Sequence, residues 1–334
     1  MVPLTSVSAC TPVHCFFVLA WMVGSPAFTP IPEAEASLRR NIAWQVALEN
    51  VGFSPGLIDG NPGRKTHIAT WEFQRVKGLP KTGELDKATA EALKVDPDGA
   101  IIRYTVQPEN LKEVDPVPQG WVAKSKKNLM GYDNLEEALA ERCHCTRGLL
   151  QRLNPGKNLS SLKVGEKFVG PAVADPDNSP QAGHIEVNLN DKIVRVIDRD
   201  KQLVGLYHCS IAASKTKLPS GSAEVESVTA NPEYTFDPKM WPEVTERITS
   251  KLTIPAGPRN PVGRCWIQLS LPGVGMHGSP HPEMIGKTGS HGCFRLTNWD
   301  AVRLAKMVKG GTPSKPGTPV KFFDTPSEAA QKIQ

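Results

Sequence analysis

A short stretch near the C-terminus brings together residue types that can carry out nucleophilic catalysis. Ser290, His291, Gly292 and Cys293 follow one another, and His277 lies sixteen residues before the cysteine. A cysteine is a good nucleophile as its thiolate, and a nearby imidazole lowers the pKa of the thiol by forming an ion pair. The stretch therefore indicates a cysteine nucleophile with a histidine base.

Two histidines are candidates for that base. Side chains at i and i+2 of an extended segment point the same way, which is a poor geometry for sharing a proton, so we expect His291 to support the loop or the substrate by hydrogen bonding. His277 arrives from a separate strand end and is expected to be the general base. Gly292 lets the backbone approach the substrate closely, and we expect its N–H and that of Cys293 to form an oxyanion hole.

The same residues also fit ordinary structural roles and a metal site. A cysteine in a glycine-rich loop is often a small packed hydrophobe, and a single histidine is often structural. Zinc favours nitrogen and sulfur ligands, but no pair here shows the helical or knuckle spacing of known zinc sites, so we expect no metal and no cofactor. The zinc interpretation would use His277, His281, His291 and Cys293.

The residues before and after this stretch have the pattern of a β-rich domain. Apolar and polar residues alternate from Ile185 to Leu189, a turn follows, and an apolar strand continues to Ile197. One helix is expected after Thr297, which begins a capping box. The pattern predicts a mainly-β catalytic domain over residues 184–325, a curved sheet or sandwich with one packed helix.

Residues 37–95 have a helical pattern instead. Trp44, Ala47, Leu48 and Val51 recur at i, i+3, i+4 and i+7, as expected for an amphipathic helix. Two further short helices follow, the last of them capped by Asp86. We expect a small three-helix bundle, which is adequate for binding and is not expected to carry chemistry.

Residues 100–173 predict a small α+β module, so the chain as a whole is multidomain. Residues 174–183, rich in Pro, Asp, Asn and Ser, form a linker that is expected to isolate the last domain. The order in the module is strand, helix, helix, strand, over residues 104–106, 135–142, 149–153 and 162–169.

The N-terminus has the features of a signal peptide. An apolar run from Cys15 to Gly24 is too short to span a membrane, and Ala34 and Ala36 offer a cleavage site, although no Lys or Arg precedes the run. We expect residues 1–36 to be a signal peptide and the protein to be exported to the periplasm or cell envelope. An uncleaved apolar anchor is the alternative.

Charge and cysteine content restrict the partners and the redox state. The net charge is +5, without a run of five or six basic residues, which argues against a nucleic-acid partner and suits an anionic cell-wall polymer. Of seven cysteines, Cys10 and Cys15 lie in the leader, and the five that remain cannot all pair. Cys143 and Cys145 are too close for an easy disulfide.

The last domain closely resembles the L,D-transpeptidase catalytic family. The resemblance lies in His277-Gly278 followed by Ser290-His291-Gly292-Cys293-Phe294-Arg295-Leu296-Thr297-Asn298. It implies that the cysteine attacks the carbonyl before a terminal D-alanine of a peptidoglycan stem peptide, releases D-alanine and forms a thioester. It also implies that the carbonyl of Gly278 orients His277, that Arg295 binds a carboxylate or braces the site, and that Ser290 and Asn298 support the substrate.

Two further resemblances concern the N-terminal modules. Residues 37–95 resemble the type 1 peptidoglycan-binding domain in Gly52-Phe53, Ile58-Asp59-Gly60, Phe73-Gln74 and Gly78-Leu79-Pro80, which implies binding of glycan or stem peptides. Residues 100–173 resemble a degenerate lysin-motif module in Leu153-Asn154-Pro155 and Val164-Gly165-Glu166. A long insertion between Val106 and Gly131 departs from that family, and a spacer role is an equal alternative.

The acceptor of the acyl group, and catalysis itself, have alternatives at this point. The acceptor is the amine of a second stem peptide, a wall-attached lipoprotein, or water, in which case the enzyme is an L,D-carboxypeptidase-type hydrolase. A non-catalytic wall-binding protein is a further alternative, because a fold alone does not prove activity. Carbapenem-type β-lactams, which acylate members of this family, are expected to be covalent inhibitors.

Overall fold

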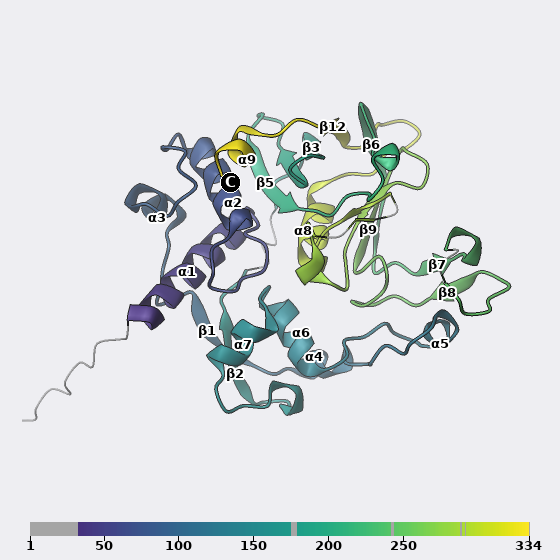
Figure 1. Ribbon diagram of the computed structural model, residues 1–334, viewed down its shortest axis with the longest axis horizontal. Coiled ribbons are helices and arrows are strands. Elements are labelled where there is room, and N and C mark those ends of the chain that lie inside the picture. The colour runs from purple at the N-terminus through teal and green to yellow at the C-terminus, as the bar shows by residue number, and fades with distance from the viewer. Residues whose placement is uncertain (1–32, 175–178, 242–243, 288, 291, 334) are drawn as a thin grey trace, which may run out of the picture.

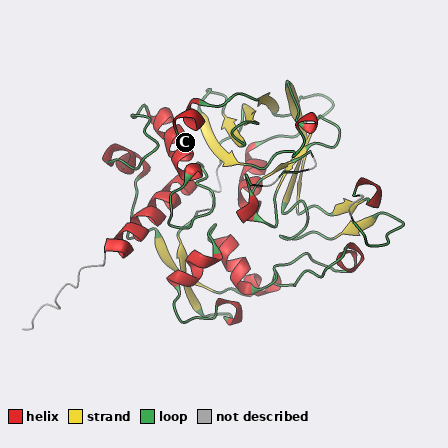
Figure 2. Cartoon of the chain, viewed as in Figure 1, coloured by secondary structure: helices red, strands yellow, loops and turns green. Residues whose placement is uncertain are grey.

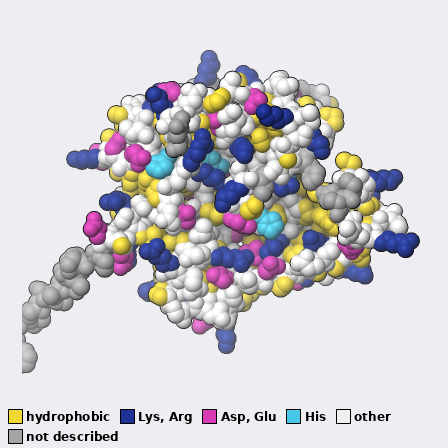
Figure 3. All heavy atoms as spheres, in the orientation of Figure 1, with side chains coloured by type: hydrophobic (Ala, Val, Ile, Leu, Met, Phe, Trp, Pro, Cys, Tyr) yellow, Lys and Arg dark blue, Asp and Glu magenta, His cyan; other side chains and the backbone are white. Residues whose placement is uncertain are grey.

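The computed structural model describes residues 33–174, 179–241, 244–287, 289–290 and 292–333 (Figure 1). Nearly all of the expected signal peptide, and also His291, therefore lie outside the described residues. Within the described part of the chain, none of the helices combines the length and apolarity that crossing a bilayer requires. Lys and Arg side chains are spread over the face seen in Figure 3, with Asp and Glu side chains among them.

The expected mainly-β domain is confirmed. Its strands, as far as the structure describes them, form one sheet in the order β11-β10-β9-β6-β12-β3-β4-β5. The pairs β10–β11 and β12–β3 are parallel, and the other neighbours are antiparallel. The strands are β3 (His184–Asn188), β4 (Ile193–Ile197), β5 (Leu203–His208), β6 (Ser222–Ala230), β9 (Cys265–Leu269), β10 (Gly275–His277), β11 (Phe294–Arg295) and β12 (Pro319–Phe323).

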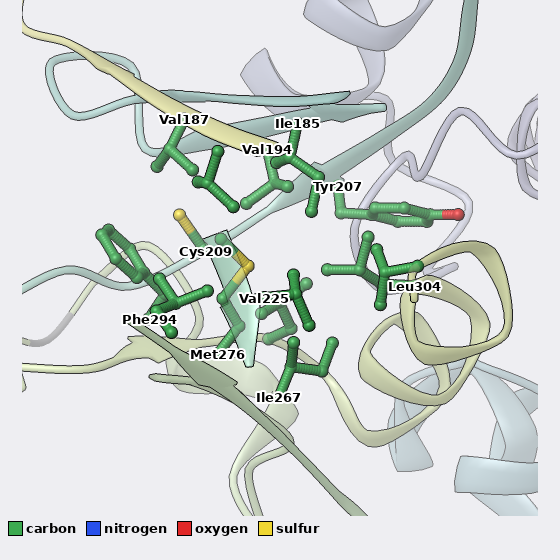
Figure 4. Close-up of a cluster of buried hydrophobic side chains, with 14 of the residues drawn as sticks. Ile185, Val187, Val194, Tyr207, Cys209, Val225, Ile267, Met276, Phe294 and Leu304 are labelled. Atoms are coloured by element: carbon green, nitrogen blue, oxygen red, sulfur yellow. The ribbon is translucent and has the colours of Figure 1, made fainter. Parts of the chain in front are cut away.

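Helix α8 (Asn298–Met307) packs against this sheet. Thr297 caps the helix, since its hydroxyl accepts the N–H of Asp300 at 3.2 Å, as the capping-box pattern predicts. Alternate residues of the strands meet the buried face of the helix in one apolar core (Figure 4). Burial of these side chains is the main favourable contribution to folding of the domain. They include Ile185, Val187, Val194, Val225, Ile267, Met276, Phe294 and Leu304.

A small two-stranded lobe, β7 (Tyr234–Phe236) and β8 (Leu252–Ile254), projects from the domain and was not expected from the sequence. A last helix, α9 (Glu328–Lys332), lies beyond the expected end of the domain at residue 325. It packs on the first module, where Lys81 contacts Glu328 at 2.7 Å. Figure 2 shows α1, α2 and α3 at the left and most strands of the large sheet at the upper right, with α8 between them.

The first module has the three helices that its pattern predicts. They are α1 (Glu33–Asn50), α2 (Arg64–Lys77) and α3 (Lys87–Leu93). Asp86 caps α3 by accepting the N–H of Thr89 at 2.8 Å. The expected cleavage site at Ala34 and Ala36 falls in the first turn of α1.

The second module also has the expected order of elements. Strands β1 (Ile101–Thr105) and β2 (Lys167–Pro171) pair antiparallel, with α6 (Leu135–Arg142) and α7 (Arg147–Leu153) between them. The closing strand begins later than the apolar pattern indicates, because Gly165 makes a turn with φ of 88°. The insertion contains α4 (Pro108–Lys112) and α5 (Trp121–Ser125).

The prediction that a linker isolates the catalytic domain is wrong. One apolar cluster joins α1 and α2 to Ile193 and Leu206 of the sheet. The segment around Phe53 lies along the outer strand β5, where the N–H of Leu206 donates to Gly52 at 2.9 Å and the carbonyl of Leu206 accepts from Ser54 at 2.8 Å. An exposed edge strand tends to pair with other chains, and here the first module covers it.

Buried ion pairs also cross between the modules. Nε of Arg195, on β4, donates to Glu72, on α2, at 2.9 Å. Arg303, on α8, contacts Glu49, on α1, at 3.3 Å, and the same glutamate is 3.0 Å from Nδ1 of His144 in the second module. The modules and the catalytic domain therefore share buried polar contacts as well as a core.

Replacing Glu72 tests whether the modules are coupled. Glu72→Ala leaves Arg195 buried without its carboxylate, and the free energy of unfolding is expected to fall by about 3 kcal/mol. Glu35→Ala is the control, because it breaks a half-exposed pair with Arg39 and is expected to cost less than about 1 kcal/mol. Urea unfolding at neutral pH measures both.

Removal of residues 37–171 is the stronger form of this test. The truncated chain would expose the apolar side chains of β4 and β5 to water, so we expect it to unfold or aggregate rather than to behave as an independent domain. Equal urea midpoints for the full and truncated chains would contradict a shared core.

Candidate active site

The edge of the sheet places the catalytic candidates on one face. Strand β10 pairs His277 with Trp266 of β9 and with Arg295 of β11. Paired residues of neighbouring strands point to the same face, and residues two apart on one strand do so as well. Cys293 lies in the bend that precedes β11, and it lines the same cavity as His277 and Arg295.

The Cys293 thiol lines a cavity of about 340 Å³. Trp266, His277 and Arg295 of the sheet form one wall, and the β7–β8 lobe contributes a second wall that the sequence analysis did not foresee. The thiol lies 3.5 Å from the carbonyl of Gly273, to which it donates. The other lining residues of the lobe include Tyr234, Thr235, Asp237, Met240 and Trp241.

Cys293 differs in accessibility from the other cysteines that the structure describes. Cys143, Cys145, Cys209 and Cys265 are buried, whereas Cys293 is partly exposed. Burial raises the pKa of Cys209 and of Cys265 to about 12, so both remain thiols at neutral pH. Among the described residues, Cys293 is thus the thiol that a substrate can reach.

His277 is held in a defined orientation. Its Nδ1 lies 2.7 Å from the carbonyl oxygen of Gly278 and donates to it, which leaves the lone pair on Nε2. The ring packs on Trp266 with 5.5 Å between ring centroids. The imidazole is 4% exposed, so water cannot easily compete for it.

Burial sets the charge states of the His277 imidazole and the Cys293 thiol. It lowers the pKa of His277 to about 4, with the hydrogen bond to Gly278 opposing this shift and the charge of Arg295 adding to it. Burial also raises the pKa of Cys293, against the N–H of Gly275 and the charge of Arg295. At neutral pH the site therefore holds a neutral imidazole and a thiol rather than the ion pair inferred from the sequence.

Ser290 braces the loop that carries the nucleophile. Its hydroxyl makes a short hydrogen bond to the carbonyl of Cys293 and accepts the N–H of Gly292 at 3.2 Å. A serine that accepts the N–H two residues later is a common local turn. The Gly292 N–H is engaged in this way, and its expected place in an oxyanion hole stays a prediction.

The loop is tied to the segment that follows β5. The N–H of Ser290 donates to Ile211 at 2.7 Å, and the N–H of Ala213 donates to Ser290 at 2.9 Å. Arg295 exchanges two backbone hydrogen bonds with Ser210, at 2.8 and 3.0 Å. The Arg295 side chain is only partly buried and faces the cavity, where a guanidinium suits a carboxylate.

Asn298 is not among the residues that line the cavity of Cys293, and its expected support of the substrate stays a prediction. The chain turns from β11 into α8, and this puts Asn298 in the first helical turn, buried beneath Gly278. Its Oδ1 accepts the N–H of Arg264 at 3.1 Å, and its Nδ2 donates to Pro258 at 3.0 Å and to Glu141. The residue anchors backbone segments.

The zinc interpretation of the sequence would use His277, His281, His291 and Cys293. Among the residues that the structure describes, no group of three His, Cys, Asp or Glu side chains is placed to hold a metal ion. His281 is exposed and faces Glu283 at 3.6 Å, away from the residues that line the cavity of Cys293. His291 was a member of that proposed set and lies outside the described residues.

Family models match two parts of the chain. The model described as "L,D-transpeptidase catalytic domain" matches residues 182–321, and the model described as "Putative peptidoglycan binding domain" matches residues 42–93. Residues 94–181, which include the second module, lie between these two matches, so the lysin-motif resemblance stays a prediction.

Two curated relatives match part of the chain. A Bacillus licheniformis protein named "Putative L,D-transpeptidase YkuD" is 31% identical over 176 residues, which is 53% of this chain and 89% of that protein. A Bacillus subtilis protein named "Putative L,D-transpeptidase YqjB" is 30% identical over 141 residues, 40% of this chain and 70% of its own length.

Solved structures are more distant. The L,D-transpeptidase from Xylanimonas cellulosilytica is 16% identical, with a TM-score of 0.32 and coverage of 84% of this chain and 92% of that one. The L,D-transpeptidase from Mycobacterium smegmatis is 18% identical, with a TM-score of 0.31 and coverage of 41% and 57%. The chain thus spans little more than half the length of the second structure.

The low pKa of His277 makes a prediction about stability. Between pH 6.5 and about 4 the unfolded chain binds a proton at this residue and the folded chain does not, so its contribution to stability is lost as the pH falls through this range. His277→Gln removes that titration. Compared with wild type, the variant is expected to lose about 2 kcal/mol less of its free energy of unfolding between pH 7 and pH 5.

Urea unfolding of wild type and of His277→Gln, each at pH 7 and at pH 5, measures this difference in the free energy of unfolding. Asp300, whose pKa burial raises to about 7, shifts the stability in the opposite direction, but it is present in both proteins and cancels in the comparison. Parallel pH dependences for wild type and variant would show that His277 titrates alike in the folded and unfolded states.

Proposed function

The chain belongs to the L,D-transpeptidase family, and from this premise we propose that it acts on peptidoglycan stem peptides with Cys293 as the nucleophile. One observation carries the proposal. The reachable thiol and a neutral, oriented imidazole line the same cavity, from neighbouring strands at the edge of the sheet. This is the arrangement that a nucleophile and its general base require.

The first step is acylation of the cysteine. As Sγ attacks the carbonyl carbon before the terminal D-alanine, Nε2 of His277 takes the thiol proton. The C–N bond then breaks, and the imidazolium returns its proton to the leaving amine, so that D-alanine departs and a thioester remains. The backbone N–H of Cys293 is the donor that we assign to the developing oxyanion, since that of Gly292 is engaged by Ser290.

The second step transfers the acyl group. An amine attacks the thioester, His277 takes its proton, and the thiol is restored as the new amide forms. The proposed acceptor is the side-chain amine of a second stem peptide, in cell-wall cross-linking or remodelling. A wall-attached lipoprotein is the alternative amine, and attack by water would make the enzyme a carboxypeptidase-type hydrolase.

The cavity walls fit a peptide with a charged end. Arg295 offers a planar guanidinium for a substrate carboxylate, and Tyr234, Trp241 and Trp266 offer apolar surface for the stem. The first module, as a peptidoglycan-binding domain, would hold the enzyme on its polymer. We further propose export to the periplasm or cell envelope, where that polymer is found.

Substitution of the nucleophile tests the proposal directly. Cys293→Ser is expected to lower turnover of a defined tetrapeptide muropeptide by at least about a thousandfold, because a serine hydroxyl is a poor nucleophile without a matched base. Cys209→Ala, which alters a buried core thiol, is the control and is expected to retain the reaction. Mass spectrometry of the products measures turnover and also distinguishes cross-links from hydrolysis. Near-normal turnover by Cys293→Ser would remove the basis of the assignment.

The base assignment has its own test. His277→Ala is expected to reduce turnover by about a hundredfold or more and to slow alkylation of Cys293 at neutral pH, since no imidazole remains to accept the thiol proton. A carbapenem-type β-lactam is expected to label wild type and to fail with Cys293→Ala. His291→Ala is expected to lower activity with a smaller change in the alkylation pH profile, and a larger change there would exchange the roles of the two histidines.

A further inference from the structure

The hydrogen bonds that hold the catalytic histidine continue beneath it. Gly278, whose carbonyl accepts from His277, lies so close to Asn298 that a Cβ on the glycine would be 2.3 Å from Oδ1. A Cβ on Gly263 would be 2.2 Å from the same oxygen. Oδ1 also accepts the N–H of Arg264 at 3.1 Å. The position of the Gly278 carbonyl therefore depends on where the Asn298 amide lies.

The Asn298 amide is in turn held from outside the catalytic domain. Its Nδ2 donates to both carboxylate oxygens of Glu141, at 3.1 and 3.2 Å. Glu141 lies on α6 of the second module, 157 residues away in the chain. The Tyr132 hydroxyl donates to the same carboxylate at 2.8 Å, and Nε of Arg264 lies 3.6 Å from it.

The Glu141 carboxylate favours one of the two orientations of the Asn298 amide. A carboxylate only accepts hydrogen bonds, so Nδ2 must face Glu141 and Oδ1 must face Arg264 and the two glycines. In the reverse orientation, Nδ2 would meet the Arg264 N–H and the backbone of Gly278, where only an acceptor fits. Without Glu141 the buried Nδ2 would lose both of its contacts with the carboxylate and would retain one acceptor, the carbonyl of Pro258, so the amide would be held less firmly.

We propose that Glu141 is a positioning residue for the transpeptidase reaction: it fixes the Asn298 amide, which sets the Gly278 carbonyl that orients His277. The inference rests on the proposed role of His277 as the general base. It gives the second module a part in the active site, beyond glycan binding or spacing. The module then cannot be exchanged for another wall-binding domain without loss of catalysis.

Glu137 provides a matched control on the same helix. Its side chain is 13% exposed, as is that of Glu141, and it also reaches an arginine of the catalytic domain, with 2.9 Å to Arg259. Its partners do not include Asn298 or Gly278. Loss of either glutamate removes a contact between the modules, but only loss of Glu141 removes hydrogen bonds from the Asn298 amide.

The experiment compares Glu141→Ala, Glu141→Gln and Glu137→Ala in the full chain. Glu141→Ala is expected to lower kcat by about ten- to a hundredfold with little change in KM, and to slow Cys293 alkylation at pH 7, because a misplaced base costs this much. In Glu141→Gln the amide oxygen can accept from both Tyr132 and Asn298, so kcat is expected to return to within about threefold of wild type. Glu137→Ala is expected to lower Tm comparably while changing kcat less than about threefold.

Three results would overturn the inference. If kcat falls in proportion to Tm for both alanine variants, Glu141 acts on stability alone. If His277→Ala, measured alongside, leaves the alkylation profile unchanged, the proposed base fails and this inference fails with it. A shift for His277→Ala without one for Glu141→Ala refutes the role of Glu141 and leaves the proposed function intact.

A double variant keeps the test decisive if Glu141→Ala does not fold. Glu141→Met fills a similar volume and removes the acceptor, and it can be combined with Asn298→Ala. Glu141→Met is expected to reduce kcat in the wild-type background. Because Glu141 and Asn298 both act through Gly278, adding Glu141→Met to Asn298→Ala is expected to lower kcat no further. Full additivity of the two losses would overturn the proposed path.

Discussion

Glu72 of the first module lies against Arg195 of the sheet, and Glu49 lies against Arg303 of α8, in each case out of contact with water. A buried charge without a partner costs several kcal/mol, so the modules can pack only where each glutamate meets its arginine. The apolar cluster beside these pairs favours contact but has no direction of its own. The burial of charge therefore selects one orientation of the modules on the catalytic domain.

The need to pair a carboxylate that is shielded from water also applies beneath the active site. The Glu141 side chain is only 13% exposed, and Asn298 and Tyr132 donate hydrogen bonds to its carboxylate. Burial raises its pKa, with the charge of Arg264 and these hydrogen bonds opposing the shift, so the loss of any donor would make the carboxylate harder to keep ionised. The support of Gly278 and the packing of the second module thus depend on one another.

The site itself uses burial to keep its groups neutral until substrate arrives. A His277 imidazole with a pKa of about 4 is free to accept a proton throughout the neutral range, and a thiol with a raised pKa gives up its proton only as it attacks. The β7–β8 lobe forms the outer wall of this cavity, and α5 of the second module stacks on the lobe, with 4.1 Å between the ring centroids of Trp121 and Phe236. At the right of Figure 1, α5 is seen beside β7 and β8.

The sequence by itself determined the elements and the chemistry. Period-two alternation specified the strands, caps at Asp86 and Thr297 specified helix starts, and the local motif around Cys293 specified the family, because each of these signals acts between near neighbours in the chain. Only the tertiary structure decided that Asn298 lies beneath Gly278, that the Gly292 N–H is taken by Ser290, and that the modules share a core. Those outcomes depend on which groups become buried together across distant parts of the chain, and the cost of leaving a buried polar group unpaired acts only once the chain has folded.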